Sequence, residues 1–268
     1  MFRSRLVLIL ALLAAVPAAA EEAAETYVFG IVPQQSGSRL SRLWSPILAW
    51  LEERSGLRLR FATTRNIPTF ERRLAQGKYD FAYMNPYHYI QFHERSGYTA
   101  FARARDKRLK GILVVRRDSP FRRLADLDEQ DLAFPSNAFA ANLVPRAVFR
   151  QEGIDVEAHF VSSHDSVYRN VAKGRYPAGG GVMRTFRNTP AAYRKQLRVL
   201  WTSEGYTPHA FAAHPRVPPE AVERLQAAML AMDRDPRGRA LLKRIRLKGI
   251  EAGSDPDWND VRELAIND

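Results

Sequence analysis

The amino-acid sequence predicts an α/β protein of two lobes with a ligand cleft between them. Short apolar runs alternate along the chain with amphipathic helical stripes, a pattern that specifies parallel-rich sheets covered by helices. The strand signals are too numerous for one small sheet, and no long linker divides the chain. We therefore expect one lobe from 26–107 together with 205–268, and a second lobe from 110–198. The chain would cross between the lobes near 105–111 and 198–203.

The first twenty residues have the pattern of a secretory signal peptide. Arg3 and Arg5 form a basic start, an apolar run follows over 6–16, and Ala18-Ala19-Ala20 provides small residues before a cleavage site. The apolar run is too short for a confident membrane span, although an uncleaved N-terminal anchor is the alternative. We expect an exported, periplasmic protein whose mature chain begins near Glu21.

The composition excludes several classes of protein. The chain has no cysteine, which rules out disulfides, thiolate metal sites, cysteine nucleophiles and a lipid-anchored N-terminus. A formal net charge of +12 is typical of proteins that bind nucleic acid, an anionic membrane surface or an anionic small molecule. Export argues against nucleic acid, and the arginines are scattered rather than gathered in one basic arm. A generally arginine-rich surface is the simpler alternative to an anionic ligand.

Hydrophobic periodicity places the elements of the first lobe. From Leu40, apolar residues recur at i+3, i+4, i+7, i+8 and i+11, which is one stripe of a helix that Gly56 ends. A short apolar run that Pro33 ends is typical of a buried strand. The elements expected here are, in chain order, strand 27–32, helix 40–51, strand 57–61, strand 79–84 and helix 87–95.

The alternation continues through the rest of the chain, where Gly153 and Gly174 end two helical stripes. The elements expected there are strand 111–116, a helical turn 124–127, strand 131–134, helix 142–152, strand 156–161, helix 163–173 and strand 178–182. After these come strands 199–202 and 209–213, helices 219–232 and 235–245, and a short helix after Pro256.

The same pattern predicts where a ligand would bind. Open α/β sheets bind ligands beyond the carboxyl ends of their strands, where helix N-termini point. Two such lobes facing one another would bring these ends into one cleft. The segments expected to line it are 33–38, 85–89, 135–141, 162–165 and 179–184.

The candidate ligand-binding residues carry hydrogen-bond donors or positive charge. An imidazole, a tyrosine hydroxyl, an amide or a guanidinium can bind an oxyanion, and so can backbone N–H groups at a helix start. The candidates are Gln34, Gln35, Tyr87, Asn137, Ala138, His164, Asp165, Arg184 and Tyr206. His209 follows Tyr206 closely in the chain and could also reach the cleft.

Simpler structural roles compete with these assignments. Asp165 could cap a helix, Tyr87 could pack in the core, and Arg184 could lie in solvent. His88 and His93 are five residues apart, a poor spacing for a shared metal ion, and we expect both at the surface.

The sequence argues against an enzyme. Residues 162–165 include serine, histidine and aspartate, but neighbouring residues cannot adopt the geometry of a hydrolase triad, and no Gly-x-Ser-x-Gly motif occurs. A phosphate-binding P-loop, a Gly-x-Gly-x-x-Gly motif and a His-Glu-x-x-His motif are also absent from the sequence. We therefore expect no catalytic residue, no cofactor and no metal.

Several stretches near the predicted cleft occur in the order and spacing of a known family. They are Gly30-Ile31-Val32-Pro33, 77–82 with Asn85-Pro86-Tyr87, Leu143-Val144-Pro145-Arg146 with Gly153-Ile154-Asp155, 163–167, and 199–203 with Pro218-Pro219-Glu220. Over about 26–235 the chain resembles the phosphate-, phosphite- and phosphonate-type solute-binding proteins of ABC transporters. The resemblance implies a type II periplasmic-binding-protein fold, a small anionic ligand, a membrane permease as partner, and a monomer.

Two departures from that family concern the ligand. Members that bind phosphonates carry a turn rich in Ser and Thr before the Leu-Val-Pro sequence, whereas here the turn is Ala138-Phe139-Ala140. The stretch 176–181 reads Tyr-Pro-Ala-Gly-Gly-Gly, where the family commonly has an acidic strand start. Related proteins sense other oxyanions, such as arsenic species, for histidine kinases, and this sensing role is the alternative function. An enzyme on the same scaffold is a further alternative.

Overall fold

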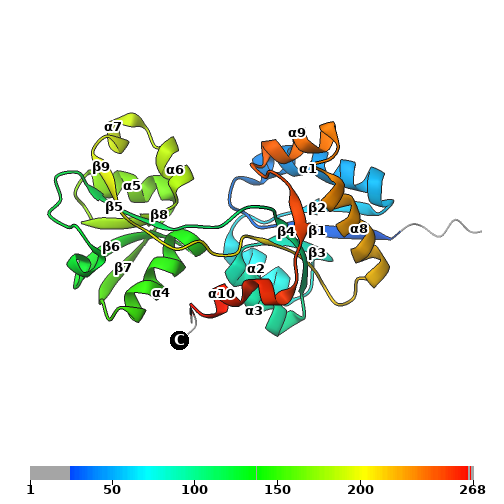
Figure 1. Ribbon diagram of the computed structural model, residues 1–268, viewed down its shortest axis with the longest axis horizontal. Helices are drawn as coiled ribbons and strands as arrows, with labels where there is room; N and C mark the ends of the chain where they lie inside the picture. The colour runs from blue at the N-terminus through cyan, green and yellow to red at the C-terminus, as the bar shows by residue number, and fades with distance from the viewer. Residues whose placement is uncertain (1–24, 137, 265, 267–268) are drawn as a thin grey trace, which may run out of the picture.

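The computed structural model describes residues 25–136, 138–264 and 266, and it contains two α/β bodies side by side (Figure 1). We call them the first lobe, built on a six-stranded sheet, and the second lobe, built on a five-stranded sheet. The predicted two-lobed α/β fold is therefore confirmed. The predicted signal peptide, 1–20, lies outside the described residues. Within those residues, no helix combines the length and the apolar character needed to cross a membrane.

The sheet of the first lobe brings three strand ends to one edge. Its strands are β1 (Thr26–Ile31), β2 (Arg58–Ala62), β3 (Phe81–Met84), β4 (Thr99–Ala104), β10 (Ala210–Ala213) and β11 (Ile250–Ala252). They are arranged in the order β11-β4-β10-β3-β1-β2. Because β1 pairs in parallel with both β2 and β3, the carboxyl ends of these three strands lie at the same edge of the sheet.

Helices cover both faces of this sheet. They are α1 (Gly37–Ser55), α2 (Ile67–Ala75), α3 (Pro86–Ser96), α8 (Pro219–Ala231), α9 (Pro236–Arg244), the 3-10 turn η3 (Asp255–Trp258) and α10 (Asn259–Arg262). Alternate residues of β1 point to opposite faces, so that Phe29 packs in the cluster with α1, α8 and α9, and Val28 packs against the cluster with α2 and α3. Helix α1 ends at Gly56, whose φ of 68° suits glycine.

The sheet of the second lobe repeats the arrangement with five strands. These are β5 (Ile112–Arg116), β6 (Gln130–Pro135), β7 (Val156–Val161), β8 (Ala178–Gly181) and β9 (Leu197–Thr202), in the order β7-β6-β8-β5-β9. Strand β6 is parallel to β7 and β8. The helical elements are η1 (Leu124–Leu127), the π-helix η2 (Phe139–Leu143), α4 (Val144–Gln151), α5 (His164–Ala172), α6 (Met183–Asn188) and α7 (Ala191–Arg194).

Both sheets are mixed, and they contain the parallel pairs that the alternating pattern predicts, β1 with β2 and β3, and β6 with β7 and β8. Strand β10 runs antiparallel to β3 and β4, and β5 runs antiparallel to β8 and β9. These two are the first strands that the chain enters after passing from one lobe to the other. The chain arrives at the edge where the neighbouring strands end, so the arriving strand must run against them.

Two segments, 105–111 and 203–209, connect the lobes and pair with each other. Leu109 and Tyr206 exchange backbone hydrogen bonds of 2.8 and 2.9 Å, and the Ser203 amide donates to the Gly111 carbonyl at 2.9 Å. The first segment agrees with the predicted crossing. The second lies further along than the predicted 198–203, because β9 continues to Thr202.

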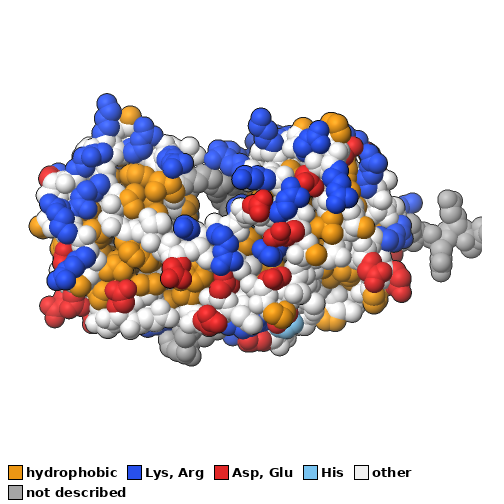
Figure 2. Space-filling model, in the orientation of Figure 1, with side chains coloured by type: hydrophobic (Ala, Val, Ile, Leu, Met, Phe, Trp, Pro, Cys, Tyr) orange, Lys and Arg blue, Asp and Glu red, His pale blue; other side chains and the backbone are white. Residues whose placement is uncertain are grey.

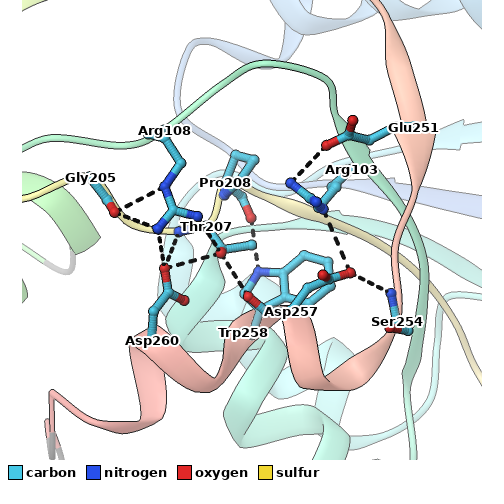
Figure 3. A network of polar contacts seen from close by, with 10 residues as sticks. All are labelled: Arg103, Arg108, Gly205, Thr207, Pro208, Glu251, Ser254, Asp257, Trp258 and Asp260. Atoms are coloured by element: carbon cyan, nitrogen blue, oxygen red, sulfur yellow. Dashed lines mark hydrogen bonds and ion pairs between the residues drawn. The ribbon is translucent and has the colours of Figure 1, made fainter.

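The C-terminal turn and helix hold this connection to the first lobe (Figure 3). Arg108 on one segment donates to the Gly205 carbonyl on the other at 3.0 Å and to the Asp260 carboxylate at 2.8 Å. The Thr207 amide donates to the same carboxylate at 2.8 Å, and Trp258 Nε1 donates to the Pro208 carbonyl at 2.9 Å. Segments from three parts of the sequence therefore meet beside the connection.

Candidate functional site

The candidate site lies where the strands of the two lobes end. In the first lobe, β1 leads to Gln34, β2 to Thr63 and β3 to Asn85. In the second lobe, the parallel strands β6 and β7 lead to Ala138 and His164. Parallel strands that end at a common edge deliver the following loops to that edge, so these loops form one face of each lobe.

Gln34, His209 and Tyr83 form a contiguous polar and aromatic group in the first lobe. Gln34 Nε2 lies 2.7 Å from His209 Nε2, and the His209 ring stacks on the Tyr83 ring with 5.0 Å between centroids. His209 is 7% exposed, while Gln34 is exposed. The buried His209 therefore restrains the exposed Gln34 side chain. Gln35 is half-buried, and its Oε1 has no hydrogen-bond partner among the described residues.

The two tyrosine candidates keep their hydroxyl protons at neutral pH. Burial raises the pKa of Tyr87 above its usual range, and burial also raises the pKa of Tyr206. The Tyr87 hydroxyl accepts a hydrogen bond from Gln91 Nε2 at 2.7 Å. Tyr206 is 9% exposed and contacts Phe139 of the second lobe edge-to-face, with 6.0 Å between ring centroids.

A buried network positions the loop that carries Tyr87. Asn85 accepts a hydrogen bond from the His88 amide at 2.8 Å, and His88 Nε2 lies 3.0 Å from Glu71 Oε1 on α2. The expectation that His88 lies at the surface is therefore wrong, because its residue exposure is 0%. His93 is half-buried, with Nδ1 2.8 Å from the Tyr98 carbonyl oxygen. No group of metal-ligating side chains occurs in the part of the chain that the structure describes.

In the second lobe, His164 and Asp165 occupy the first turn of α5. Ser163 caps this helix by accepting a hydrogen bond from the Ser166 amide at 3.2 Å. The cap is therefore Ser163 and not Asp165, which is exposed. His164 is half-buried. Ala138 directly precedes η2 and supplies no side-chain hydrogen bond there.

The triple glycine of β8 has a packing role. A Cβ on Gly180 would lie 1.9 Å from the Ala141 carbonyl oxygen of η2, and one on Gly181 would lie 2.0 Å from the Tyr168 hydroxyl of α5. The absent side chains thus allow η2 and α5 to lie directly on the strand. Asn137 lies outside the described residues, and so does the side chain of Arg184, although α6 includes its backbone.

A pocket of about 510 Å³ lies at the same edge of the first lobe as Gln34. Three threonines, two arginines, one asparagine and one glycine line it: Gly37, Thr63, Thr64, Arg65, Asn66, Thr69 and Arg73. None of them is among the candidate ligand-binding residues, and only Gly37 falls in a segment predicted to line the cleft, 33–38. The signal that could have found them is the run Thr-Thr-Arg-Asn directly after the strand predicted at 57–61, which obeys the same strand-end rule as the predicted segments.

A pocket of about 590 Å³ lies elsewhere in the first lobe, between α1 and α8, and includes Arg54 and Ser55. These two residues end α1, a helix of 19 residues. At 1.5 Å per residue they lie about 27 Å from Gly37 at its start. This pocket therefore does not belong to the candidate site.

Positive charge flanks the opening between the lobes. Figure 2 shows a notch between them, with Lys and Arg side chains gathered along the upper edge of both lobes and most Asp and Glu side chains below. The stretches 183–198 in the second lobe and 236–248 in the first contain arginine and lysine but neither aspartate nor glutamate. A concentration of one sign of charge beside a cleft attracts ligands of the opposite sign.

The chain is similar to known proteins. Residues 29–258 match the model of the family described as "ABC transporter, phosphonate, periplasmic substrate-binding protein". The phosphonates-binding periplasmic protein of Escherichia coli K12 is 23% identical over 266 residues, covering 93% of this chain and 79% of that protein.

Two solved structures have a similar fold. One is PhnD1 of Prochlorococcus marinus in complex with methylphosphonate, with a TM-score of 0.77, 16% identity, and coverage of 90% of this chain and 97% of that chain. The other is a binding protein component of an ABC phosphonate transporter from Pseudomonas aeruginosa, with a TM-score of 0.74, 17% identity, and coverage of 90% and 85%.

Proposed function

The chain belongs to the family of periplasmic substrate-binding proteins of phosphonate ABC transporters, and from this premise we propose that it captures a small phosphonate-type oxyanion between its lobes. The observation that carries the proposal is the family match, which spans both lobes from residue 29 to residue 258. PhnD1, which has a similar fold, is in complex with methylphosphonate. Methylphosphonate is therefore the first ligand to test.

The paired connection between the lobes suits a binding protein that closes on its ligand. Two short segments that absorb a change in backbone angles allow rigid lobes to rotate together. Closure would convert the binding energy into a shape that the membrane permease of an ABC transporter recognises. The protein would act as a monomer, reach the periplasm through the signal peptide at 1–20, and catalyse no reaction. No observation favours the alternative of a histidine-kinase partner.

The proposed ligand contacts come from both lobes. In the first lobe, Gln34 and Tyr87 offer donors at the strand ends, and His209 supports Gln34 from behind. In the second lobe, His164 at the start of α5 offers an imidazole. The remaining proposed contacts are those predicted from the sequence: Gln35, Asn137, Ala138, Asp165, Arg184 and Tyr206.

We expect methylphosphonate to raise the melting temperature of the purified mature protein. A ligand that binds only the folded state at 100 times its dissociation constant adds about 2.7 kcal/mol of stability, which corresponds to about 5–10 °C for a chain of this size. A thermal-shift screen would compare methylphosphonate, aminoethylphosphonate, phosphate, phosphite, sulfate and arsenite. A flat response to both phosphonates would contradict the proposed ligand class, and a response to arsenite alone would favour the sensing role.

Substituting His209 with alanine is expected to weaken phosphonate binding about tenfold. The substitution removes the ring that lies between Gln34 and Tyr83, so that Gln34 is no longer held toward the ligand, and a lost hydrogen bond of this kind corresponds to about 1.4 kcal/mol. Isothermal titration calorimetry would measure the dissociation constant. His159→Ala is the matched control, because His159 on β7 pairs with Asp131 on β6. Equal affinity in the two variants would contradict a role for His209.

A further inference from the structure

The second lobe lacks the groups that would hold a phosphonyl head group at its Ala138-Phe139-Ala140 turn. The turn has no side-chain hydroxyl, and Phe139 is only 4% exposed, with its ring against Tyr206. The π-helix η2 begins inside this turn, at Phe139, and runs directly into α4. The head group must therefore find its side-chain donors elsewhere.

The pocket of about 510 Å³ in the first lobe offers those donors. Its lining includes two guanidinium groups, those of Arg65 and Arg73, and no carboxylate. Arg65 forms no hydrogen bond or ion pair with the residues that the structure describes, and its side chain is exposed. The volume of the pocket falls within the range of about 300–1,000 Å³ typical of small-molecule sites.

The hydrogen bonds inside the pocket decide which hydroxyl can donate to a ligand. Thr63 donates to the Ile31 carbonyl at 2.7 Å, and Thr64 donates to the Asn66 carbonyl at 2.8 Å. Thr69, in contrast, accepts a hydrogen bond from Arg72 at 2.9 Å. The proton of the Thr69 hydroxyl is therefore available, and it adds to the two guanidinium groups.

The pocket also joins the strand-end face that carries Gln34. The bond from Thr63 to the Ile31 carbonyl ties the loop after β2 to the end of β1. A Cβ on Gly37 would lie 3.6 Å from the Thr63 side chain, so the start of α1 packs on the same loop. A ligand whose anionic group lay between Arg65 and Arg73 could extend its substituent toward Gln34.

We propose that Arg65 and Arg73, with the Thr69 hydroxyl, bind the phosphonyl group of the ligand. We call these three side chains the anion seat, and they all belong to the first lobe. This inference rests on the proposed function and names the part of the site that takes the charge. Guanidinium groups bind phosphonyl oxygens through charge-assisted hydrogen bonds, which are stronger than bonds between neutral groups. The ligand class is that of the proposed function, an organophosphonate.

The test is calorimetric titration of methylphosphonate and phosphate into the mature protein and its arginine variants. Arg65→Gln and Arg73→Gln are each expected to weaken methylphosphonate binding about tenfold, and the double variant about a hundredfold. Arg60→Gln is the matched control, because Arg60 is an exposed arginine on β2 outside the pocket lining. Its affinity should equal that of the unmodified protein. Melting temperatures of all variants would show that each is folded.

The possible outcomes distinguish an error in the choice of anion-binding residues from an error in the proposed function. If the unmodified protein binds methylphosphonate and the double variant binds it equally well, the anion seat is not at these arginines, although the proposed function stands. If the unmodified protein binds neither phosphonate nor phosphate, the proposed function is wrong and the seat with it. Binding of phosphate more tightly than methylphosphonate would overturn the organophosphonate class.

Discussion

Replacing Trp258 by alanine is expected to lower the free energy of unfolding by about 3–5 kcal/mol, the range for removing a buried tryptophan side chain. The indole is 0% exposed and packs against Tyr89 with 4.7 Å between ring centroids. Its Nε1 also donates to the Pro208 carbonyl in the connection between the lobes. The substitution therefore removes both a core side chain and a tie on the connection. Equilibrium unfolding in urea would measure the loss.

A second substitution separates the two contributions. Trp258→Phe keeps most of the apolar contact but leaves the Pro208 carbonyl without its donor, and we expect it to cost about 1–3 kcal/mol. The alanine variant should thus be clearly less stable than the phenylalanine variant. A loss below about 1 kcal/mol for alanine would mean that η3 and α10 do not hold the connection as Figure 3 indicates.

The elements that sequence reasoning located correctly have unambiguous local signals. Helix α1 carries a regular apolar stripe and a left-handed glycine at its end, and α3 begins at Pro86, is capped by Asn85 and ends before the left-handed Gly97. Strand β7 was predicted at 156–161 and has those bounds. In each case the hydrophobic period and the terminating residues agree, so local propensity and tertiary structure specify the same element.

Most of the missed elements have weaker local signals. Helix α2 has an Asn66 cap and a proline in its first turn, but it has only nine residues and buries only Phe70 and Leu74. Strand β4 is buried on both faces and rich in alanine, and it therefore shows no clear alternation. Strand β11 has three residues, and the short helices α6 and α7 were also missed. Only the neighbouring strands and helices determine these elements, and a single sequence does not reveal those neighbours.

One missed helix explains an error at the candidate site. His88 was expected at the surface because its spacing from His93 does not suit a shared metal ion. The side-chain partner of His88, Glu71, belongs to α2, the helix that the sequence did not reveal. The omission of Thr63 to Asn66 from the predicted site has another cause, since the strand-end rule was applied to β1 and β3 but not to β2. Because β1, β2 and β3 all end at the same edge of the sheet, the rule applies to β2 as well.

Substituting Gly180 with alanine is expected to cost about 3 kcal/mol of stability, the upper end of the range for overpacking a core. The new Cβ would lie 1.9 Å from the Ala141 carbonyl oxygen and 2.6 Å from the Phe134 ring. The first contact is with backbone, which cannot move away as a flexible side chain can. Strand β8 lies in the centre of its sheet, between β6 and β5. Because both neighbours pair with it, β8 cannot move away from η2 either. Thermal or urea unfolding would measure the change.

Gly153→Ala provides the control, because a Cβ there would meet nothing within 4 Å while its φ is 68°. That variant should lose only the cost of a left-handed alanine, about 1–2 kcal/mol. If Gly180→Ala were no more destabilising than Gly153→Ala, η2 would be free to move away from β8. The turn Ala138-Phe139-Ala140 could then rearrange and offer its backbone N–H groups to an anion. If the predicted difference is found, η2 is fixed on the sheet, and the second lobe cannot form an anion seat by moving this turn. The stability of one glycine variant therefore bears directly on which lobe holds the charge of the ligand.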